Sequence, residues 1–549
     1  MLLRTSVTVI FLTAGAFAQM SSFPKPSYFR ETFQKAQTKV ELRDPVRLKD
    51  FVAEGKLELS LKHYLELVMS NNTDVQIQLL SLEIPKNAIQ SAMGVWDPTS
   101  RTSFSTTRAT SLPSSALDAR NAGAISKNLT QPYSLQFSQQ LETGGSYSAT
   151  FSGSKSSQTN SFANYNPSLT ANLNFGVTQP LIRNRGIYVN KIPLMTAQSN
   201  LRISEYNLRS QLLNLVNTAE NAYWSVISAR ENLRVTEKAR DTAAAFLKYM
   251  QQQLDLGALS PLDIFNPQSQ LAQQEVAVAQ ARFNLARAED VLRHQLGADL
   301  DPDVRMLPIS LTESVDIGGA DSMPVDREQE VTKALATNPS MKSVTQRLDV
   351  DDLSIQSAKN GLLPNLMFNA SYQSNGRGGI YYPSSSLLSG GGSAEPLPGG
   401  IADALGQMFG FGYPTYQAGL TLTLPIRSRA ASAAMANAIV QKKQDALAVR
   451  NQQQNIRLNI LNAVTALEGA KEQLKLARTN LDFANKNLDA ENKKFELGNE
   501  INQNVINAQQ QVAQAEATVV NQQISVRLSL LNLLTQTGAL LDERGIVVK

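Results

Sequence analysis

The chain has 549 residues, of which 42% are hydrophobic and 18% are charged, and its net charge is +4. So small a charge, with no dense run of Lys or Arg, argues against nucleic acid as a partner. The absence of cysteine excludes disulfides, cysteine metal ligands, cysteine nucleophiles and lipidation on cysteine. The length allows two to four ordinary domains or one elongated architecture.

The first 18 residues resemble a secretory signal peptide. Arg4 supplies a positive charge, Val7 to Thr13 is mostly apolar, and Ala16-Phe17-Ala18 fits a small-x-small cleavage site. We expect cleavage before Gln19; the alternative is a short buried helix. No later run reaches the roughly 18–20 apolar residues that a membrane-spanning helix needs.

A helix of about 61–97 precedes a region in which apolar residues alternate with Ser, Thr, Asn and Gln, as in YSLQFSQQLE and SLTANLNFGV. Period-two alternation predicts β-strands. SYSATFSGS predicts one more strand, joined to its predecessor by a tight turn at Glu142-Thr143-Gly144-Gly145. Because the polar positions are uncharged, the strands suit a wall between lipid and a watery lumen. The alternative is a soluble β-sandwich.

Two very long helical stretches follow the strands. They run from Pro180 to Gly257 and from Pro425 to Gly498, and at 1.5 Å per residue each is roughly 100–110 Å long. The helix returning from Gly257 to Gly297 covers about 60 Å and the helix at 61–97 about 55 Å by the same rise. Laid end to end, these two match one long helix, so we expect one continuous rod and one broken rod per unit.

The chain contains a duplication. Residues after Gly257 and after Gly498 match at a constant offset of 241 without a gap for 40 residues. The segments around Asn72 and Asn338 match at an offset of 266, and TQPLIRNRG matches TLPIRSRA. Apolar residues recur every seven positions after Gly257, which predicts helices packed as coiled coils.

This pattern predicts two successive units, each with helices on both sides of its strands. Whether each chain supplies four strands or six stays open. The expected organisation is a signal peptide at 1–18, an N-terminal belt segment at 19–58, a first unit at 59–297 with strands at about 99–180, a linker in the belt at 298–328, a second unit at 329–538 with strands at about 364–425, and a tail at 539–549.

The repeated units, the export signal, Gln179-Pro180-Leu181 and the two Leu-Gly turns before Ala- and Gln-rich heptad helices resemble the TolC-like outer membrane efflux protein family. The resemblance covers most of residues 59–538. It implies a mixed α and β membrane protein, built of duplicated helix–strand–strand–helix units. As a homotrimer, these would form a β-barrel in outer membrane lipid, continued by a long periplasmic α-helical barrel.

The resemblance also implies roles for particular residues. The turns at Leu256-Gly257 and Leu497-Gly498 would form the periplasmic tip, which contacts an adaptor (membrane fusion) protein linked to an inner-membrane pump. Gly257 and Gly498 would permit a left-handed helix cap. The junction between barrel and helices would fall at Gln179, Pro180 and Pro425.

The pore constriction would lie just beyond these turns. Some family members carry two acids after the second glycine, but this chain has Asn504 and Asn507 there, and Asp263 and Asn266 at the equivalent first-copy positions. We therefore carry over the constriction and not the double acidic ring. Asp263 would place three carboxylates around a trimer axis if it faces inward; the alternative is a solvated residue at a helix start.

The sequence favours a passive duct over an enzyme. It has no phosphate-binding glycine loop or nucleophile elbow, and its only histidines, His63 and His294, lack metal-ligand spacing. We expect no catalytic residue, metal or cofactor. The prediction is an outer membrane channel of a tripartite efflux or type I secretion system, gated at its periplasmic tip, with the cargo undetermined. The alternative is an exported coiled-coil stalk or adhesin with a β anchor.

Overall fold

The computed structural model describes residues 48–53, 55–112, 125–159, 164–257, 260–298, 305–316, 325–383, 395–497, 499 and 501–546. All of them belong to the unit Arg47–Lys549. The predicted signal peptide, most of the segment 19–58 and Gly498 lie outside the described residues. No described helix is apolar over a length sufficient to cross a bilayer.

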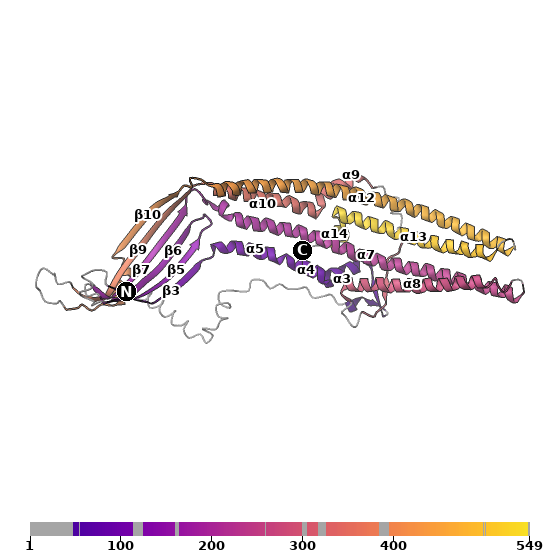
Figure 1. Ribbon diagram of the computed structural model, residues 1–549, viewed down its shortest axis with the longest axis horizontal. Coiled ribbons are helices and arrows are strands. Elements are labelled where there is room, and N and C mark those ends of the chain that lie inside the picture. Colours follow the sequence, from indigo (N-terminus) through magenta and orange to yellow (C-terminus); the bar gives the residue numbers. More distant parts are fainter. Residues whose placement is uncertain are drawn as a thin grey trace. The chain divides into compact units, whose positions relative to one another are not determined.

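Two long helical hairpins dominate the described chain (Figure 1). The first joins α7 (Ile187–Asp255) to α8 (Phe265–Leu296), and the second joins α12 (Arg429–Glu496) to α13 (Asn502–Thr537). The 69 residues of α7 and the 68 of α12 give rods of roughly 100 Å, as predicted. The shorter helices are α3 (Leu61–Asn71), α4 (Thr73–Ser81), α5 (Glu83–Met93), α9 (Arg327–Thr337), α10 (Pro339–Gly361), α11 (Ile401–Phe409) and α14 (Leu540–Glu543).

The large sheet gathers strands from both units. Its order is β10-β9-β7-β6-β5-β3, with β4 also paired to β5. Because β3 and β4 continue one another along β5, the sheet has six rows of strands, and neighbouring rows are antiparallel. The hairpin of β5 and β6 belongs to this sheet, so the described chain supplies six rows rather than four. The strands are β3 (Thr99–Phe104), β4 (Thr107–Ser111), β5 (Ser126–Gln140), β6 (Ser146–Gln158), β7 (Tyr165–Pro180), β9 (Asn365–Tyr381) and β10 (Pro414–Thr423).

The pairing register keeps the two faces of this sheet chemically distinct. Leu135, Phe151 and Leu173 lie directly opposite one another on successive strands, and so do Phe175 and Tyr372. The other face carries Ser, Thr, Asn and Gln. Examples on neighbouring strands are Ser134, Ser152, Asn172, Asn375 and Gln417. Since neighbouring residues on a strand point to opposite faces, the alternation predicted from single strands extends across the whole sheet.

In both units, one asparagine side chain joins the two short helices that make up the broken rod; we call this contact the asparagine clamp. Asn72 caps the start of α4, where its Oδ1 accepts from Asp74 N and Val75 N, while its Nδ2 donates to the Gln295 carbonyl at the end of α8, 2.9 Å away. Gly297 then ends α8 with φ +67.

In the second unit, Asn338 caps α10 and its Nδ2 donates to Gln536 O at 2.9 Å, while Gly538 ends α13 with φ +77. The short helices therefore meet end to end, as expected. The single helix predicted at 61–97 is wrong in detail: Asn72 starts a new helix, and Pro85, which removes a backbone donor, is confined to the first turn of α5.

A small sheet and a partly buried carboxylate cover the first junction. The sheet has the order β1-β2-β8 and comprises β1 (Val52–Ala53), β2 (Lys56–Leu59) and β8 (Ile309–Leu311). Glu313 accepts hydrogen bonds from Tyr223 OH at 2.6 Å and from Leu61 N at 3.0 Å. The pairing of β2 with β8 thus brings described residues of the segments 19–58 and 298–328 together at this junction; that these segments form a belt stays a prediction.

Candidate functional site: the paired helical tips

The first tip is the turn between α7 and α8. Leu256 follows α7 and is 79% exposed, and Gly257 has φ +74. A Cβ on Gly257 would meet no other atom within 4 Å. The left-handed backbone, rather than crowding, is therefore what favours glycine here. The predicted left-handed cap is confirmed at this position.

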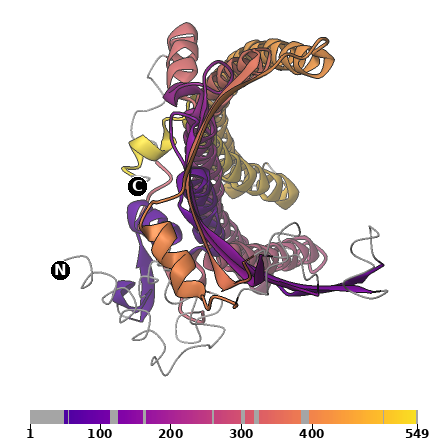
Figure 2. The ribbon, with the colours of Figure 1, turned by 90° about the vertical axis from the view of Figure 1, so that its left-hand side faces the viewer.

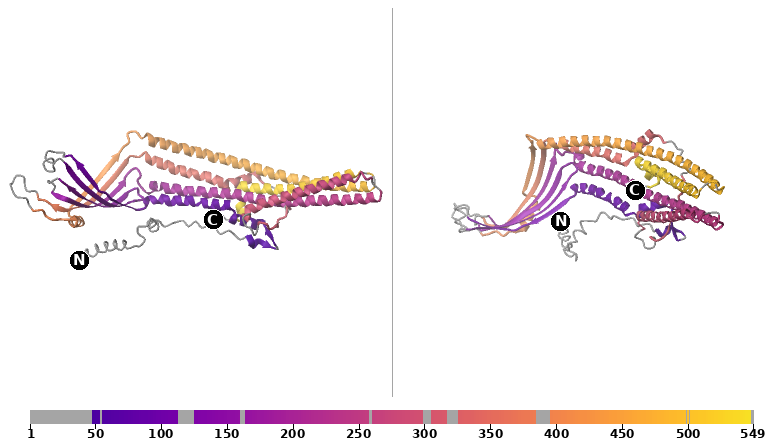
Figure 3. Two further views of the ribbon diagram at one scale, coloured as in Figure 1. Left: turned by 60° about the horizontal axis from the view of Figure 1, so that its bottom comes forward. Right: turned by 45° about the vertical axis from the view of Figure 1, so that its right-hand side comes forward.

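The second tip lies beside the first. Leu497 ends α12 and is 75% exposed, and the chain resumes as a helix at Asn502. Asn502 Nδ2 donates to the backbone carbonyl of Asp263 at 3.0 Å, which joins the two turns directly. Figure 3 shows in two views that both hairpins end at the same end of the molecule.

The four predicted constriction residues lie at the starts of the two returning helices. Asp263 is exposed just before α8, and Asn266 is exposed in its first turn. Asn504 is partly buried in the first turn of α13, and Asn507 is exposed and accepts from Gln503 Nε2 at 3.0 Å. Asp263 alone among the four carries a charge, so any anionic field at these positions comes from it.

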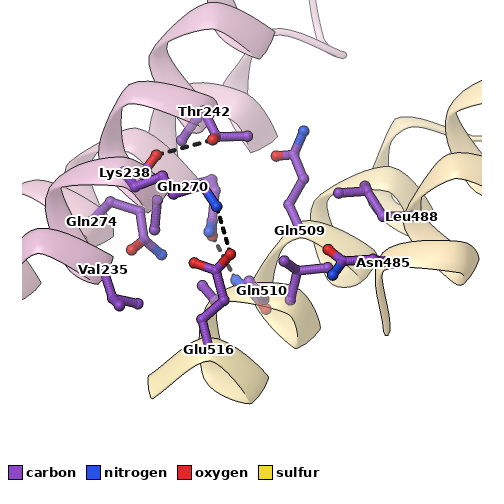
Figure 4. A pocket seen from close by; sticks show the side chains of 14 residues that line it. Val235, Lys238, Thr242, Gln270, Gln274, Asn485, Leu488, Gln509, Gln510 and Glu516 are labelled. Atoms are coloured by element: carbon purple, nitrogen blue, oxygen red, sulfur yellow. Dashed lines mark hydrogen bonds and ion pairs between the residues drawn. The ribbon is translucent and has the colours of Figure 1, made fainter. Parts of the chain in front are cut away.

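A polar seam joins the hairpins above the tips (Figure 4). Lys238 Nζ on α7 lies 2.5 Å from Glu516 Oε1 on α13, and Gln510 Nε2 donates to Gln270 Oε1 at 2.6 Å. These residues line a pocket of about 150 Å³ between α7, α8, α12 and α13. Sequence reasoning missed this seam, because only the pairing of the two hairpins in space brings these side chains together.

The tip region lies outside the two large apolar cores that hold the rest of the helices. One core packs α7 and α8 against α3, and a second packs α12 and α13 against α9. The described residues of 228–284 and 475–518 belong to neither core. They nevertheless bury Met250, Ile264, Val505 and Ile506 to 8% exposure or less. The ring centroid of Phe495 on α12 also lies 5.9 Å from that of Phe246 and 6.4 Å from that of Tyr249 on α7. The hairpins are therefore held together near their tips by local apolar and aromatic contacts as well as by the polar seam.

The predicted junction residues lie where strands give way to helices. Gln179 and Pro180 are the last two residues of β7, and the Gln179 side chain reaches the turn before β6, where Thr143 Oγ1 donates to its Oε1 at 3.3 Å. Pro425 is exposed between β10 and α12. Gln179 thus ties the end of β7 to the adjacent hairpin turn.

The fold is that of solved outer membrane channels. The chain aligns with the Campylobacter jejuni CmeC outer membrane channel at a TM-score of 0.60 and 14% identity, covering 93% of this chain and 90% of that one. It aligns with CusC at 0.61 and 12% identity, covering 92% and 98%. It aligns with the open state of the Neisseria gonorrhoeae MtrE channel at 0.57 and 14% identity, covering 87% and 89%. Comparison with curated protein sequences gave no match.

The family follows from the sequence itself. The model of the outer membrane efflux protein family matches residues 146–298 and 331–539, which is more than half of the chain. The chain belongs to the outer membrane efflux protein family. The two matched ranges end at residues 298 and 539, one residue beyond the ends predicted for the two units.

Proposed function

We propose that three copies of this chain form a passive exit duct through the outer membrane. The observation that carries the proposal is the two-faced sheet, whose edge rows, β10 on one side and β3 with β4 on the other, pair with one described neighbour each. Joining β10 of one chain to the β3 and β4 row of the next would close a barrel of eighteen rows. Its apolar face would meet lipid, and its Ser, Thr, Asn and Gln would line water.

The helices would continue this duct into the periplasm. Each chain brings two long rods and two broken rods, with both hairpin tips at the end away from the sheet (Figure 1). The exposed Leu256 and Leu497 would meet a periplasmic adaptor protein there. Transport energy would come from an inner-membrane pump, because a duct of this kind needs no reaction chemistry of its own.

Gating would occur at the tips by separation of the hairpins. The Lys238 side chain is 62% exposed, so its pair with Glu516 contributes at most about 1 kcal/mol. Because the buried apolar side chains near the tips belong to neither of the two larger cores, parting the hairpins there would cost less than parting them beside those cores. Adaptor contacts of a few kcal/mol would then shift the population from closed to open.

Single-channel conductance of the purified, detergent-extracted protein in a planar bilayer tests the proposal. We expect small cation-selective conductance that Glu516→Gln enlarges, since this change removes the ion pair without altering side-chain size. Glu472→Gln is the matched control, because Glu472 pairs only within α12, with Lys475 at 3.7 Å, and should leave conductance unchanged.

Asp263→Asn tests the constriction separately. Reduced cation selectivity would support Asp263 at the pore, and unchanged selectivity would remove that role while the duct stands. If wild type and Glu516→Gln trimers are both silent, the duct is refuted and the coiled-coil stalk becomes the better interpretation.

A further inference from the structure

A short helix, α11, packs on one face of the large sheet, near the strand ends that are far from the helical hairpins. Helix α11 packs on β9, where Ser374 Oγ donates to Met408 O at 2.6 Å. A Cβ on Gly376 would lie 1.9 Å from Ala404 O, and one on Gly378 would lie 2.0 Å from Gly400 O. Two glycines and a buried serine therefore form a groove in β9 that admits the α11 backbone.

The helix lies on the apolar face of the sheet. Ala404 and Met408 form a small core with Ala171, Phe151 and Leu173, and the register places these last three on the apolar side. Figure 2 shows α11, the short orange helix, on the convex side of the curved sheet. Since a barrel closes around the concave side, α11 is outside the lumen.

The outward surface of α11 and its flanks is also apolar. Leu397, Ile401, Phe409 and Tyr413 are 56%, 43%, 58% and 62% exposed. Asp403 is the one charged residue from Leu397 to Tyr413. Its Oδ2 accepts from Gly400 N at 2.7 Å and so caps the helix. Such a surface is poorly suited to water.

Aromatic side chains extend this surface along the sheet. The ring centroid of Phe411 lies 6.2 Å from that of Tyr372, which in turn lies 5.2 Å from that of Tyr416. Phe411 has φ +53, a conformation that bulky side chains rarely adopt. This backbone conformation brings the Phe411 ring onto the apolar face of the sheet, next to Tyr372.

We propose that α11 is an external lipid-binding helix that binds acyl chains in the outer leaflet of the membrane and fixes the depth of the trimer. The inference rests on the proposed function, because it needs the sheet to lie in a bilayer. A neighbouring chain is not the occupant, since α11 packs on β9 and β7 while closure would occur beyond β10. Aromatic and apolar side chains at the rim of a barrel are suited to the lipid interface.

Site-specific fluorescence tests this proposal, and the cysteine-free chain makes single labelling straightforward. Phe409→Cys and Ala402→Cys, each labelled with an environment-sensitive probe, report on α11; Ala402 is small and exposed, so its replacement spares the packing. Leu420→Cys on the apolar face is the lipid control, and Gln417→Cys on the polar face is the water control. Trimers are reconstituted into phosphatidylcholine vesicles with or without nitroxide-labelled lipid, and iodide is the aqueous quencher.

We expect nitroxide lipid to quench the probes on α11 to within about twofold of the loss at residue 420, with iodide acting mainly at residue 417. Iodide quenching of the α11 probes, with residue 420 still quenched by lipid, would overturn this inference and leave the duct intact. Shielding of α11 from both quenchers would mean a protein partner and would also overturn it. Failure of lipid to quench residue 420 would refute the proposed duct itself.

Discussion

The repeated asparagine clamp allows one prediction to be tested twice in the same molecule. We consider Asn72→Ala and Asn338→Ala, with Asn72→Asp and Asn338→Asp as matched variants. Alanine removes both the helix cap and the hydrogen-bond donor to the carbonyl at the end of α8 or α13. Aspartate retains the capping oxygen but loses the donor, and it places a carboxylate against the carbonyls of Gln295 or Gln536.

The magnitude follows from the hydrogen bonds. Loss of an N-cap costs about 1 kcal/mol, and loss of the partly buried bond to the carbonyl costs about 1 kcal/mol more. A combined loss of about 2 kcal/mol raises the local opening equilibrium about 30-fold. At Asn338 the effect should be smaller, because its Oδ1 accepts only from Ser340 N, whereas Asn72 caps two amides.

Hydrogen exchange measured by mass spectrometry reports this opening locally. For Asn72→Ala we expect roughly 30-fold faster exchange at the start of α4 and the end of α8. Asn72→Asp should keep the start of α4 protected and expose only the end of α8. Exchange in Asn72→Ala within threefold of wild type at both ends, or full protection at both ends in Asn72→Asp, would refute the clamp.

Two further predictions concern buried charges. Burial, followed by a hydrogen bond with Asp445 and its charge, raises the pKa of Asp351 to about 6. The folded state therefore loses stability as pH rises from about 4 to 6, and Asp351→Asn should raise the free energy of unfolding in urea by about 1–2 kcal/mol at pH 8 and by less near pH 4. Glu220 is 1% exposed, and Arg544 Nη2 donates to it at 2.5 Å, so Arg544→Met should cost about 3–5 kcal/mol in the same assay. Asp542→Asn, which removes an exposed ion pair, should cost less than about 1 kcal/mol.

The sequence predicted the features that depend on local periodicity. The strand at Tyr133 to Leu141, the turn containing Gly144 with φ +87 and the long rods all correspond to described elements. It left the number of strands open, because alternation alone cannot say which strands pair. The segment 377–412 is rich in Gly, Ser and Pro, a composition that predicts a loop, yet its described residues complete β9 and contain α11.

The helix in this segment has no clear local signal, for a physical reason. The run IADALGQMF is only nine residues long, too short for a stable isolated helix. Its stability comes from Ala404 and Met408, which are fully buried against β7 and β9. The seam of Lys238 and Glu516 was missed for a similar reason, since 278 residues separate them. Contacts of this kind are set by the tertiary structure and have no local signal.

The number of rows in the sheet sets the width of the proposed barrel and so indicates where the duct would be narrow. Rows about 4.8 Å apart, tilted by about 40° in a barrel, each occupy about 6.3 Å of circumference, so six rows supply about 38 Å per chain. Four helical rods at about 9–10 Å each supply about 36–40 Å. Four rows would supply only about 25 Å by the same spacing and tilt. In the proposed duct, the hairpin of β5 and β6 would thus let the wall pass from strands to helices without narrowing, and this agrees with the prediction of a constriction at the tips.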